Sequence, residues 1–554
     1  MAIITAYWGL DGMIVLTTLI IAAYLYMTRK FNYWKKRDVS VALPPIPFLG
    51  NFADCLLLKK SPGNFLQELY IQGKGSPYIG FYILDKPALL IRDRQLVKMV
   101  LVKDFNYFAD RYASPDIVND RLGSANLFLI KNPAWKILRT KLTPFFTSGK
   151  MKKIFELMLE CGKDLDTYLE SLKLGDNEKE IDIKDITATY ATDIIGTAAY
   201  GFNVNSLNNP DAEFRKHGRT IFNFNIIRGV EFIAIFFLPS VVKMIGAKMF
   251  GKKNSDFLRG VFWEIISQRV KSGGKRNDLI DILIELRNTY GDQDMGGFKF
   301  DGDDLLAQAS IFFTAGFETS SSTMSFTLYE IAMNPEIQDR LRKEILDALD
   351  ETDGKITYDM IVSLPYLDMV VSETLRMYPP LPFLDRVTMD AYKLPNFDLK
   401  LEKGTPIYIS MSGMHYDPEY FPDPHKFDPE RFTEENKRNR PSNVYFPFGE
   451  GPRVCIGTRM GLLQTKLGIV TMLRKYEFLP SEKTLIPMVL NPKAFLTTPL
   501  NDGLYLNIRR DICVCLLKLL TVLSFRHQST SFSTKSFFTG TALLAEAGQQ
   551  VAVT

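Results

Sequence analysis

The chain has 554 residues, of which 46% are hydrophobic and 12% aromatic, a composition that predicts a well-filled globular core and excludes a disordered or fibrous protein. Lys and Arg number 67 against 63 Asp and Glu, so the net charge of +4 is too small to indicate a nucleic-acid partner. Five scattered cysteines exclude a disulfide scaffold, and four histidines without a Cys-x-x-Cys pair do not predict a zinc site.

The first predicted element is an apolar helix over residues 8–27, whose only charge is Asp11. A helix of this length spans about 30 Å, the thickness of a bilayer core. A basic cluster follows it, made up of Arg29, Lys30, Lys35, Lys36 and Arg37. A cleaved secretory signal is the alternative, but the basic residues come after the apolar run and no small-x-small site follows. We therefore predict an uncleaved membrane anchor at 1–28, with the remaining chain in the cytosol.

Residues 29–51 hold the basic cluster and then a proline-rich stretch with Pro44, Pro45 and Pro47. Proline fixes φ and interrupts a helix, so this stretch predicts a stiff hinge that orients a cytosolic domain against the membrane.

Residues 52–510 form one predicted domain, because we find no repeat and no internal boundary. Strands are predicted at 78–84 and 88–92 and again between 384 and 409, whereas helical patterns dominate after 131. A long helix over 303–334 ends at Pro335, and a further helix follows over 335–349. The predicted fold class is mainly α with a minor β part.

The segment 232–242 is apolar but too short to span a bilayer, and Lys243, Lys248, Lys252 and Lys253 follow it. It fits a buried core helix or an amphipathic element in the membrane interface. We favour the interfacial element, because an anchored domain holds this face near lipid.

The residues most indicative of chemistry surround Cys455, in the sequence Phe-Pro-Phe-Gly-Glu-Gly-Pro-Arg-Val-Cys-Ile-Gly over 446–457. Glycines and proline predict an irregular loop whose amides can face one sulfur, with a helix starting after it. Amides and a helix dipole stabilise a thiolate, which is an anionic metal ligand. A lone cysteine is otherwise a small buried hydrophobe, but this spacing favours a ligand.

This pattern resembles the haem-binding signature of the cytochromes P-450, in which Phe448, Gly451, Cys455 and Gly457 match the cofactor-binding positions. The resemblance implies the fold of that family, haem b as cofactor, and Cys455 as the thiolate ligand of iron. Thiolate ligation favours O–O cleavage. Met460 replaces the phenylalanine that many members carry, which we expect to change packing only.

Further motifs of the family follow in order. Glu373 and Arg376 match its Glu-x-x-Arg, and with Arg431 they are expected to form a buried structural ion-pair cluster rather than a surface pair. Ala315, Gly316, Glu318 and Thr319 match the oxygen-binding groove of the long helix. There the resemblance makes Thr319 a hydrogen-bond partner of bound oxygen and Glu318 a donor of protons through water. A tolerated kink in a core helix is the alternative.

The resemblance also assigns haem propionate contacts and a substrate pocket. Trp135, Arg139, Arg386 and Arg453 match positions that bind the propionates, since arginine forks suit carboxylates. The implied pocket is apolar and suits a lipophilic small molecule. Its predicted wall consists of Phe105, Phe108, Leu127, Phe128, Ile311, Phe312, Ala315, Leu381, Phe383 and Phe495.

The segment 378–386 resembles the insect microsomal family-six group, which implies an enzyme of the endoplasmic reticulum. Electrons would come from NADPH through cytochrome P-450 reductase, with cytochrome b5 as a further donor, and O₂ would be the second substrate. Lys136 and Lys141 are expected to attract the reductase to the face around Cys455. The leading hypothesis is thus a membrane-bound monooxygenase. The alternatives are a haem protein that binds hydrophobic ligands without turnover, or a peroxide-using haem-thiolate isomerase.

Residues 511–554 match nothing in the family. We predict a disordered extension, with translated unspliced or read-through sequence as the alternative explanation, and a metal or membrane role as a third.

Overall fold

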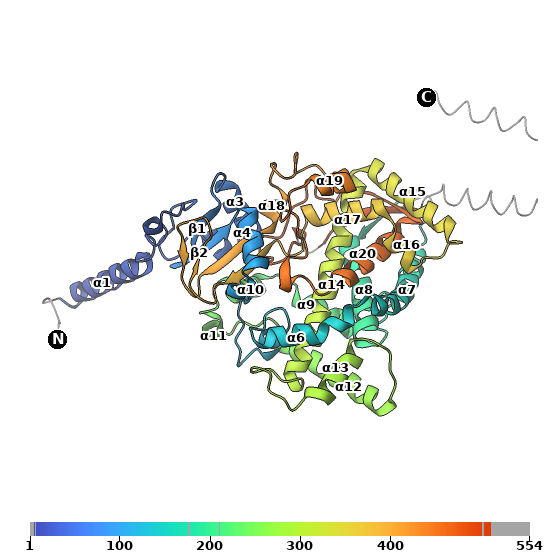
Figure 1. Cartoon of the computed structure of the whole chain (residues 1–554), viewed down its shortest axis with the longest axis horizontal. Helices are drawn as coiled ribbons and strands as arrows, with labels where there is room; N and C mark the ends of the chain where they lie inside the picture. Colours follow the sequence, from blue (N-terminus) through green and yellow to red (C-terminus); the bar gives the residue numbers. More distant parts are fainter. Residues whose placement is uncertain (1–4, 6, 175–177, 210, 501–502, 511–554) are drawn as a thin grey trace, which may run out of the picture. The chain divides into compact units, whose positions relative to one another are not determined.

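The computed structural model describes residues 5, 7–174, 178–209, 211–500 and 503–510, so the prediction for 511–554 falls outside the described residues. Helices account for most of the fold (Figure 1). They are α1 Trp8–Thr28, α2 Ala53–Leu56, α3 Pro62–Gln72, α4 Arg94–Lys98, α5 Arg121–Ala125, α6 Ala134–Leu142, α7 Ser148–Ser171, α8 Ile183–Ile195, α9 Glu213–Ile221, α10 Ile226–Phe237, α11 Val242–Ile245, α12 Lys252–Ser272, α13 Leu279–Tyr290, α14 Gly302–Met333, α15 Pro335–Glu351, α16 Tyr358–Val362, α17 Pro365–Met377, α18 Met411–His415, α19 Glu434–Asn439 and α20 Thr458–Leu473.

The strands form three small sheets. They are β1 Tyr78–Ile83, β2 Lys86–Ile91, β3 Lys179–Asp182, β4 Phe383–Val387, β5 Tyr392–Lys393, β6 Lys400–Leu401, β7 Pro406–Ser410, β8 Tyr476–Pro480 and β9 Tyr505–Arg510. The largest sheet has the order β1-β2-β7-β4, with β2 and β7 parallel and the other neighbours antiparallel. In it Arg386 of β4 lies opposite Ile407 of β7, so the sheet fixes the position of this arginine. The mainly α fold with a minor β part is confirmed.

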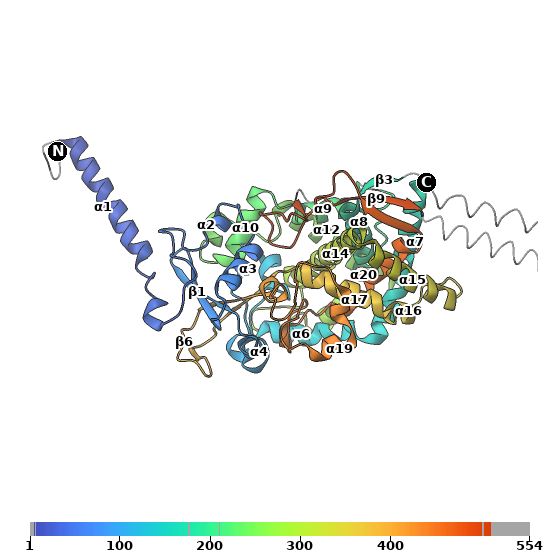
Figure 2. The same cartoon turned by 90° about the horizontal axis from the view of Figure 1, so that it is seen from above.

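Helix α14 runs through the middle of the domain, with α8 and α20 packed against it (Figures 1 and 2). Two acidic residues, Asp303 and Asp304, lie in its first turn, where the helix dipole favours negative charge. Asn334 ends the helix, and Pro335 starts α15 at a position where its missing N–H costs nothing. The predicted long helix over 303–334 is therefore confirmed to within a residue at each end.

Helix α1 covers most of the segment for which the sequence predicts a membrane anchor. The mean hydropathy of its most apolar 18-residue window is 1.8, and only 6% of that window is buried. Within the described part of the chain it is the one single helix long and apolar enough to cross a membrane. A helix that spans a bilayer must be apolar and must not be covered by the rest of the protein, and α1 has both properties.

The preference for a membrane-interface element at 232–242 is wrong for the part within α10. Residues 232–237 are each at most 6% exposed and pack inside the domain, Phe237 stacking on Phe52 at 4.7 Å and on Tyr408 at 5.1 Å. The segment is apolar because it belongs to the core, which was the alternative explanation. Its aromatic rings bury large areas against the sheet.

Candidate functional site

A cavity lies between α14, α10 and the loop that carries Cys455. Its volume, with the space at its mouth included, is about 1970 Å³. The sequence-predicted residues on its wall are Leu127, Phe128, Trp135, Arg139, Ile311, Phe312, Ala315, Gly316, Thr319, Leu381, Arg386, Phe448, Arg453, Cys455, Gly457 and Phe495. Residues far apart in the sequence thus share one enclosed site, as the motifs predict.

One stripe of α14 faces this cavity. Phe312, Ala315, Gly316 and Thr319 follow helical spacing, and Ala315 is exposed although most residues of this helix are buried. Exposure in the middle of a buried helix marks the face that borders the void. The Thr319 hydroxyl donates to the carbonyl of Ala315 at 2.7 Å, which leaves its oxygen free to accept from a group in the cavity.

Gly316 has a packing reason to be glycine. A Cβ at this position would overlap the side chain of Ile195 at the end of α8. The missing side chain therefore lets α8 approach α14 closely.

The structure does not bring Glu318 into the cavity with Thr319. The Glu318 carboxylate accepts from the ammonium of Lys184 on α8 at 2.8 Å and from the hydroxyl of Ser322 at 3.2 Å, and both charged side chains are buried. The same ammonium donates to Ser321 and Ser322. Glu318 and Thr319 are neighbours in sequence, but the helix turns their side chains toward different surroundings.

The Cys455 loop presents its sulfur to the cavity. The Cys455 amide donates to the carbonyl of Phe448 at 2.9 Å, which closes the loop before α20 begins. Gly451 has φ +72°, and a Cβ there would overlap the carbonyl oxygen of Leu101, so only glycine fits. Burial raises the pKa of the Cys455 thiol, whereas hydrogen bonds from Gly457 and Thr458 and the charge of Arg139 lower it. A bound metal cation would favour the thiolate further.

Buried arginines gather at one end of the cavity. The guanidinium of Arg453 lies 4.2 Å from the centre of the Trp135 ring and donates to the carbonyls of Ala109 and Ile130. Arg386 is 1% exposed, its Nε has no hydrogen-bond partner among the described residues, and burial together with Arg111 lowers its pKa to about 9, although the carboxylate of Asp385 raises it. Because guanidinium groups stay protonated in proteins, this shift marks a buried cation whose surroundings favour a further anionic partner.

Arg111 also lines this end of the cavity, although none of the sequence motifs identifies it as a site residue. It donates to Asp385 at 2.8 Å and lies over the Phe128 ring at 3.9 Å. Neither contact follows from a local motif, since Asp385 is far away in the sequence.

The predicted ion-pair cluster is present behind the Cys455 loop. Arg376 donates to both oxygens of Glu373, at 2.7 and 2.9 Å, and Arg431 Nε lies 3.3 Å from the same carboxylate. Glu373 and Arg376 are fully buried and do not line the cavity. Arg376 also donates to the carbonyl of His415, whose ring accepts from the amide of Phe446 at 3.3 Å. The cluster is thereby connected to the start of the Cys455 loop.

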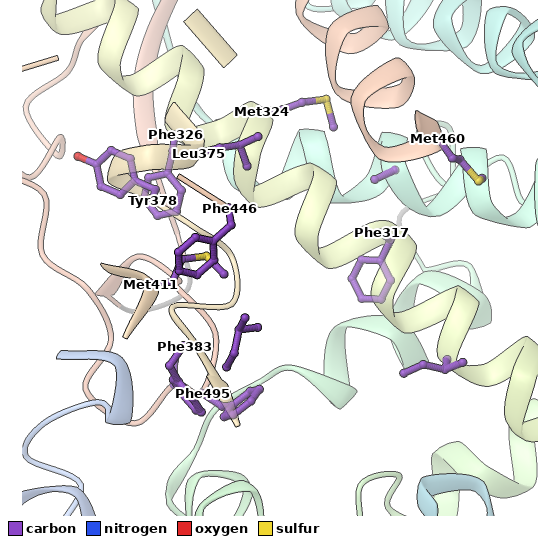
Figure 3. Packing of buried hydrophobic residues seen from close by; sticks show 14 of the residues in the cluster. Phe317, Met324, Phe326, Leu375, Tyr378, Phe383, Met411, Phe446, Met460 and Phe495 are labelled. Atoms are coloured by element: carbon purple, nitrogen blue, oxygen red, sulfur yellow. The ribbon is translucent and has the colours of Figure 1, made fainter. Parts of the chain in front are cut away.

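Three predicted pocket residues do not line the cavity. Phe105 packs on Trp135 at 5.6 Å, Phe108 meets the ring of Tyr392 at 4.9 Å, and Phe383 lies against Phe495 at 5.4 Å. Figure 3 shows Phe383 beside Phe495 in the core. Trp135 and Phe495 line the cavity in place of Phe105 and Phe383, whereas Phe108 packs on Tyr392, which does not line the cavity either.

The cavity has further apolar walls that the motifs do not identify. They are Phe145, Phe146, Ile195, Ala199, Phe222, Phe232, Phe236 and Met249, among others. Phe232 and Phe236 are one turn apart on α10, and their rings are parallel within 5°. The apolar run at 232–242 is the sequence feature that could have indicated these residues. We interpreted it as an element in the membrane interface rather than as part of the cavity wall.

Comparison with known proteins agrees with this geometry. The family model for cytochrome P450 matches residues 41–506. Among relatives, cytochrome P450 6k1 of Blattella germanica is 47% identical over 499 residues, which cover 87% of this chain and 94% of the relative. Probable cytochrome P450 6g2 of Drosophila melanogaster is 44% identical, with 90% and 98% covered, and cytochrome P450 6j1 of Blattella germanica is 42% identical, with 90% and 97% covered. The chain therefore belongs to the cytochrome P450 family and is a monooxygenase that uses a haem with a cysteine thiolate ligand.

Proposed function

We propose that this enzyme is a membrane-bound monooxygenase of the endoplasmic reticulum that inserts one oxygen atom from O₂ into a lipophilic small molecule. The observation that carries the proposal is the shared cavity, in which the Cys455 sulfur and the Ala315–Thr319 stripe of α14 meet a wall that combines arginines with many apolar side chains.

The residues fit a haem. Cys455 is the thiolate ligand in this proposal, Phe448 and Gly457 border it, and Gly451 shapes the loop. Arg386, Arg453, Arg139 and Trp135 hold the two propionates. The unsatisfied Nε of fully buried Arg386 supports this role, since a carboxylate would supply the missing acceptor. When bound, the haem supplies oxygen activation.

Two polar residues of α14, Thr319 and Glu318, take part in proton transfer in this proposal. Thr319 keeps a hydroxyl at the cavity wall as an acceptor for a water or a reacting group. Glu318 can contribute only if its carboxylate leaves Lys184 or passes a proton through Ser321 and Ser322, because its side chain points away from the cavity. We therefore assign the direct contact to Thr319, and an indirect supply of protons to Glu318.

A lipophilic substrate suits the remaining wall. Phe128, Phe232, Phe236, Phe312 and Phe495 present rings, whereas the polar side chains on the wall are the arginines and several Ser, Thr and Gln residues of α14 and α20. Such a wall favours apolar ligands and offers them few hydrogen bonds. We therefore expect ligand affinity to rise with ligand hydrophobicity, up to the size that the cavity can hold.

Electrons come from NADPH through cytochrome P450 reductase, with cytochrome b5 as a further donor. Lys136 is exposed on α6 and available for docking. Lys141 is half-buried, donates to the Tyr290 hydroxyl at 2.5 Å and lies 3.9 Å from that ring, so it is less available than the sequence indicated. Lys136→Glu should slow reduction and raise its salt sensitivity, whereas the exposed Lys74→Glu should not.

The anchor supports the location. Helix α1 supplies the bilayer span, the basic cluster after it favours the cytosolic side, and Pro44, Pro45 and Pro47 stiffen the connection. Alkaline extraction of membranes should leave the full chain bound and release a chain that lacks residues 1–28.

The activity is tested by reconstitution with reductase, NADPH and a panel of lipophilic compounds under isotopically labelled O₂. The proposal expects product that carries one labelled oxygen atom and requires reductase. Ligand binding without product over the whole panel would favour a non-catalytic binder, and product formed from peroxide alone would favour an isomerase.

A further inference from the structure

A second cleft lies outside the haem cavity, between α3, the C-terminal half of α14, the end of α17 and the loop 486–497. Its volume, with the open space at its mouth included, is about 1150 Å³. Leu496 borders both spaces, and the Thr497 amide and hydroxyl bind the carbonyls of Pro380 and Pro379 at 3.0 and 2.6 Å. A single segment of hydrogen-bonded backbone therefore separates this cleft from the haem cavity. We call it the α3–α14 cleft.

The floor of the α3–α14 cleft carries one acidic group, Glu330 of α14. The residue is 6% exposed, and its carboxylate accepts from the hydroxyl of Tyr378 at 2.6 Å. Among the residues that the structure describes, no cation pairs with it. The nearest arginine, Arg376, already donates to both oxygens of Glu373. A buried carboxylate that lacks a cation is costly, and a ligand can relieve that cost.

Aromatic and thioether side chains surround this carboxylate. Tyr329, Tyr378 and Tyr416 line the cleft, together with Met333, Met377 and Met488. The ring of Tyr378 is held in place by Phe326, against which it stacks at 4.3 Å with planes 3° apart (Figure 3). Aromatic rings around an anionic group attract organic cations, while methionines adapt to apolar groups of varied shape.

We propose that the α3–α14 cleft is a second ligand site, separate from the haem cavity, that binds an organic ammonium ion bearing an apolar group. The cation would lie against the Glu330 carboxylate and the tyrosine rings, and the apolar group would contact the methionines that line the cleft. This inference does not depend on the identity of the monooxygenase substrate.

The test uses full-length holoenzyme whose haem cavity is filled beforehand with an azole that coordinates iron. Benzyltrimethylammonium is the probe, because a quaternary ammonium cannot coordinate iron. Its uncharged isostere, neopentylbenzene, is the matched ligand control. Binding is measured by equilibrium dialysis for the wild type, Glu330→Gln and Met488→Trp. Glu330→Gln keeps the acceptor for Tyr378 and removes the charge, and Met488→Trp fills the cleft from the loop.

The proposal expects one probe bound per chain in the presence of the azole, at least tenfold weaker binding to Glu330→Gln, and loss of binding to Met488→Trp. It also expects the cation to bind more tightly than neopentylbenzene. No binding once the azole is present, or equal binding to the wild type and both variants, would overturn the proposal. Haem content of each variant shows that it is folded, and the Met488→Trp result stands alone if Glu330→Gln does not incorporate haem.

Discussion

The Glu318 carboxylate lies 2.8 Å from the ammonium of Lys184, and this buried ion pair joins α14 to α8. Its neighbours are the hydroxyls of Ser321 and Ser322, so the ammonium has three acceptors. The acid of the sequence motif is thus held by a partner that the motif does not contain. We expect this pair to contribute to the stability of the packing between the two helices.

Removing one partner of this pair should destabilise the fold. Lys184→Met leaves Glu318 buried without a cation, which costs about 3–5 kcal/mol in comparable pairs. The double variant with Glu318→Met removes both charges and should recover most of that free energy of unfolding. Denaturant midpoints of the three proteins check this, and a single variant within about 1 kcal/mol of wild type would show that the pair contributes little.

Thr319→Ala should uncouple NADPH use from product formation. The substitution removes the hydroxyl at the cavity wall, so product formed per NADPH should fall on the order of a hundredfold, the lower end of the effect of one positioned proton-transfer group. Ser310→Ala is the matched control, because Ser310 makes the same type of bond to the carbonyl four residues earlier but does not line the cavity. Equal coupling in the two variants would contradict the role given to Thr319.

Arg386→Leu should weaken haem retention. A charge-assisted hydrogen bond contributes about 1.5–3 kcal/mol, so haem loss to an acceptor protein should be at least about tenfold faster. The exposed ion-paired Arg287→Leu is the control. Unchanged haem release would remove Arg386 from the propionate contacts.

Glu330 should make stability depend on pH. Burial raises its pKa to about 7 from an ordinary 4.5, against the lowering effect of the Tyr378 hydrogen bond, and Glu373 raises it further while Arg376 lowers it. The folded state therefore holds this proton more tightly than the unfolded state. Relative to Glu330→Gln, the wild type is most stable below pH 4.5 and loses about 1–3 kcal/mol as pH rises to 7. Denaturant midpoints of both proteins at pH 5 and 7.5 measure the difference, and a constant gap between them would contradict it.

Local patterns were sufficient to predict the long helix, the first β-hairpin and the loop around Cys455. Proline and helical spacing act over a few residues, so Pro335 could be interpreted without tertiary information, whereas the clash with Leu101 that requires Gly451 could not. The contact between Glu373 and Arg376 could also be predicted from local sequence, because i, i+3 spacing places both side chains on one helix face.

Contacts between distant segments could not be predicted in this way. Whether Phe383 reaches the void depends on Phe495, and whether Glu318 faces Thr319 depends on Lys184 of another helix. For the same reason the segment within α10 was wrongly predicted to lie in the membrane interface. An apolar run has the same composition whether it contacts lipid or lines a cavity. Arg111 was missed because its partner, Asp385, is 274 residues away.

The Cys455 sulfur, open to the cavity beside the α14 stripe, is proposed as the thiolate ligand of the haem. The carbon monoxide difference spectrum of the reduced protein reports on this ligand. We expect the Soret band of a thiolate-ligated haem for the wild type, and its loss in Cys455→Ser but not in Cys161→Ser, whose buried thiol contacts Thr197. A wild-type spectrum without the thiolate band, or a Cys455→Ser variant that retains it, would show that Cys455 is not the ligand.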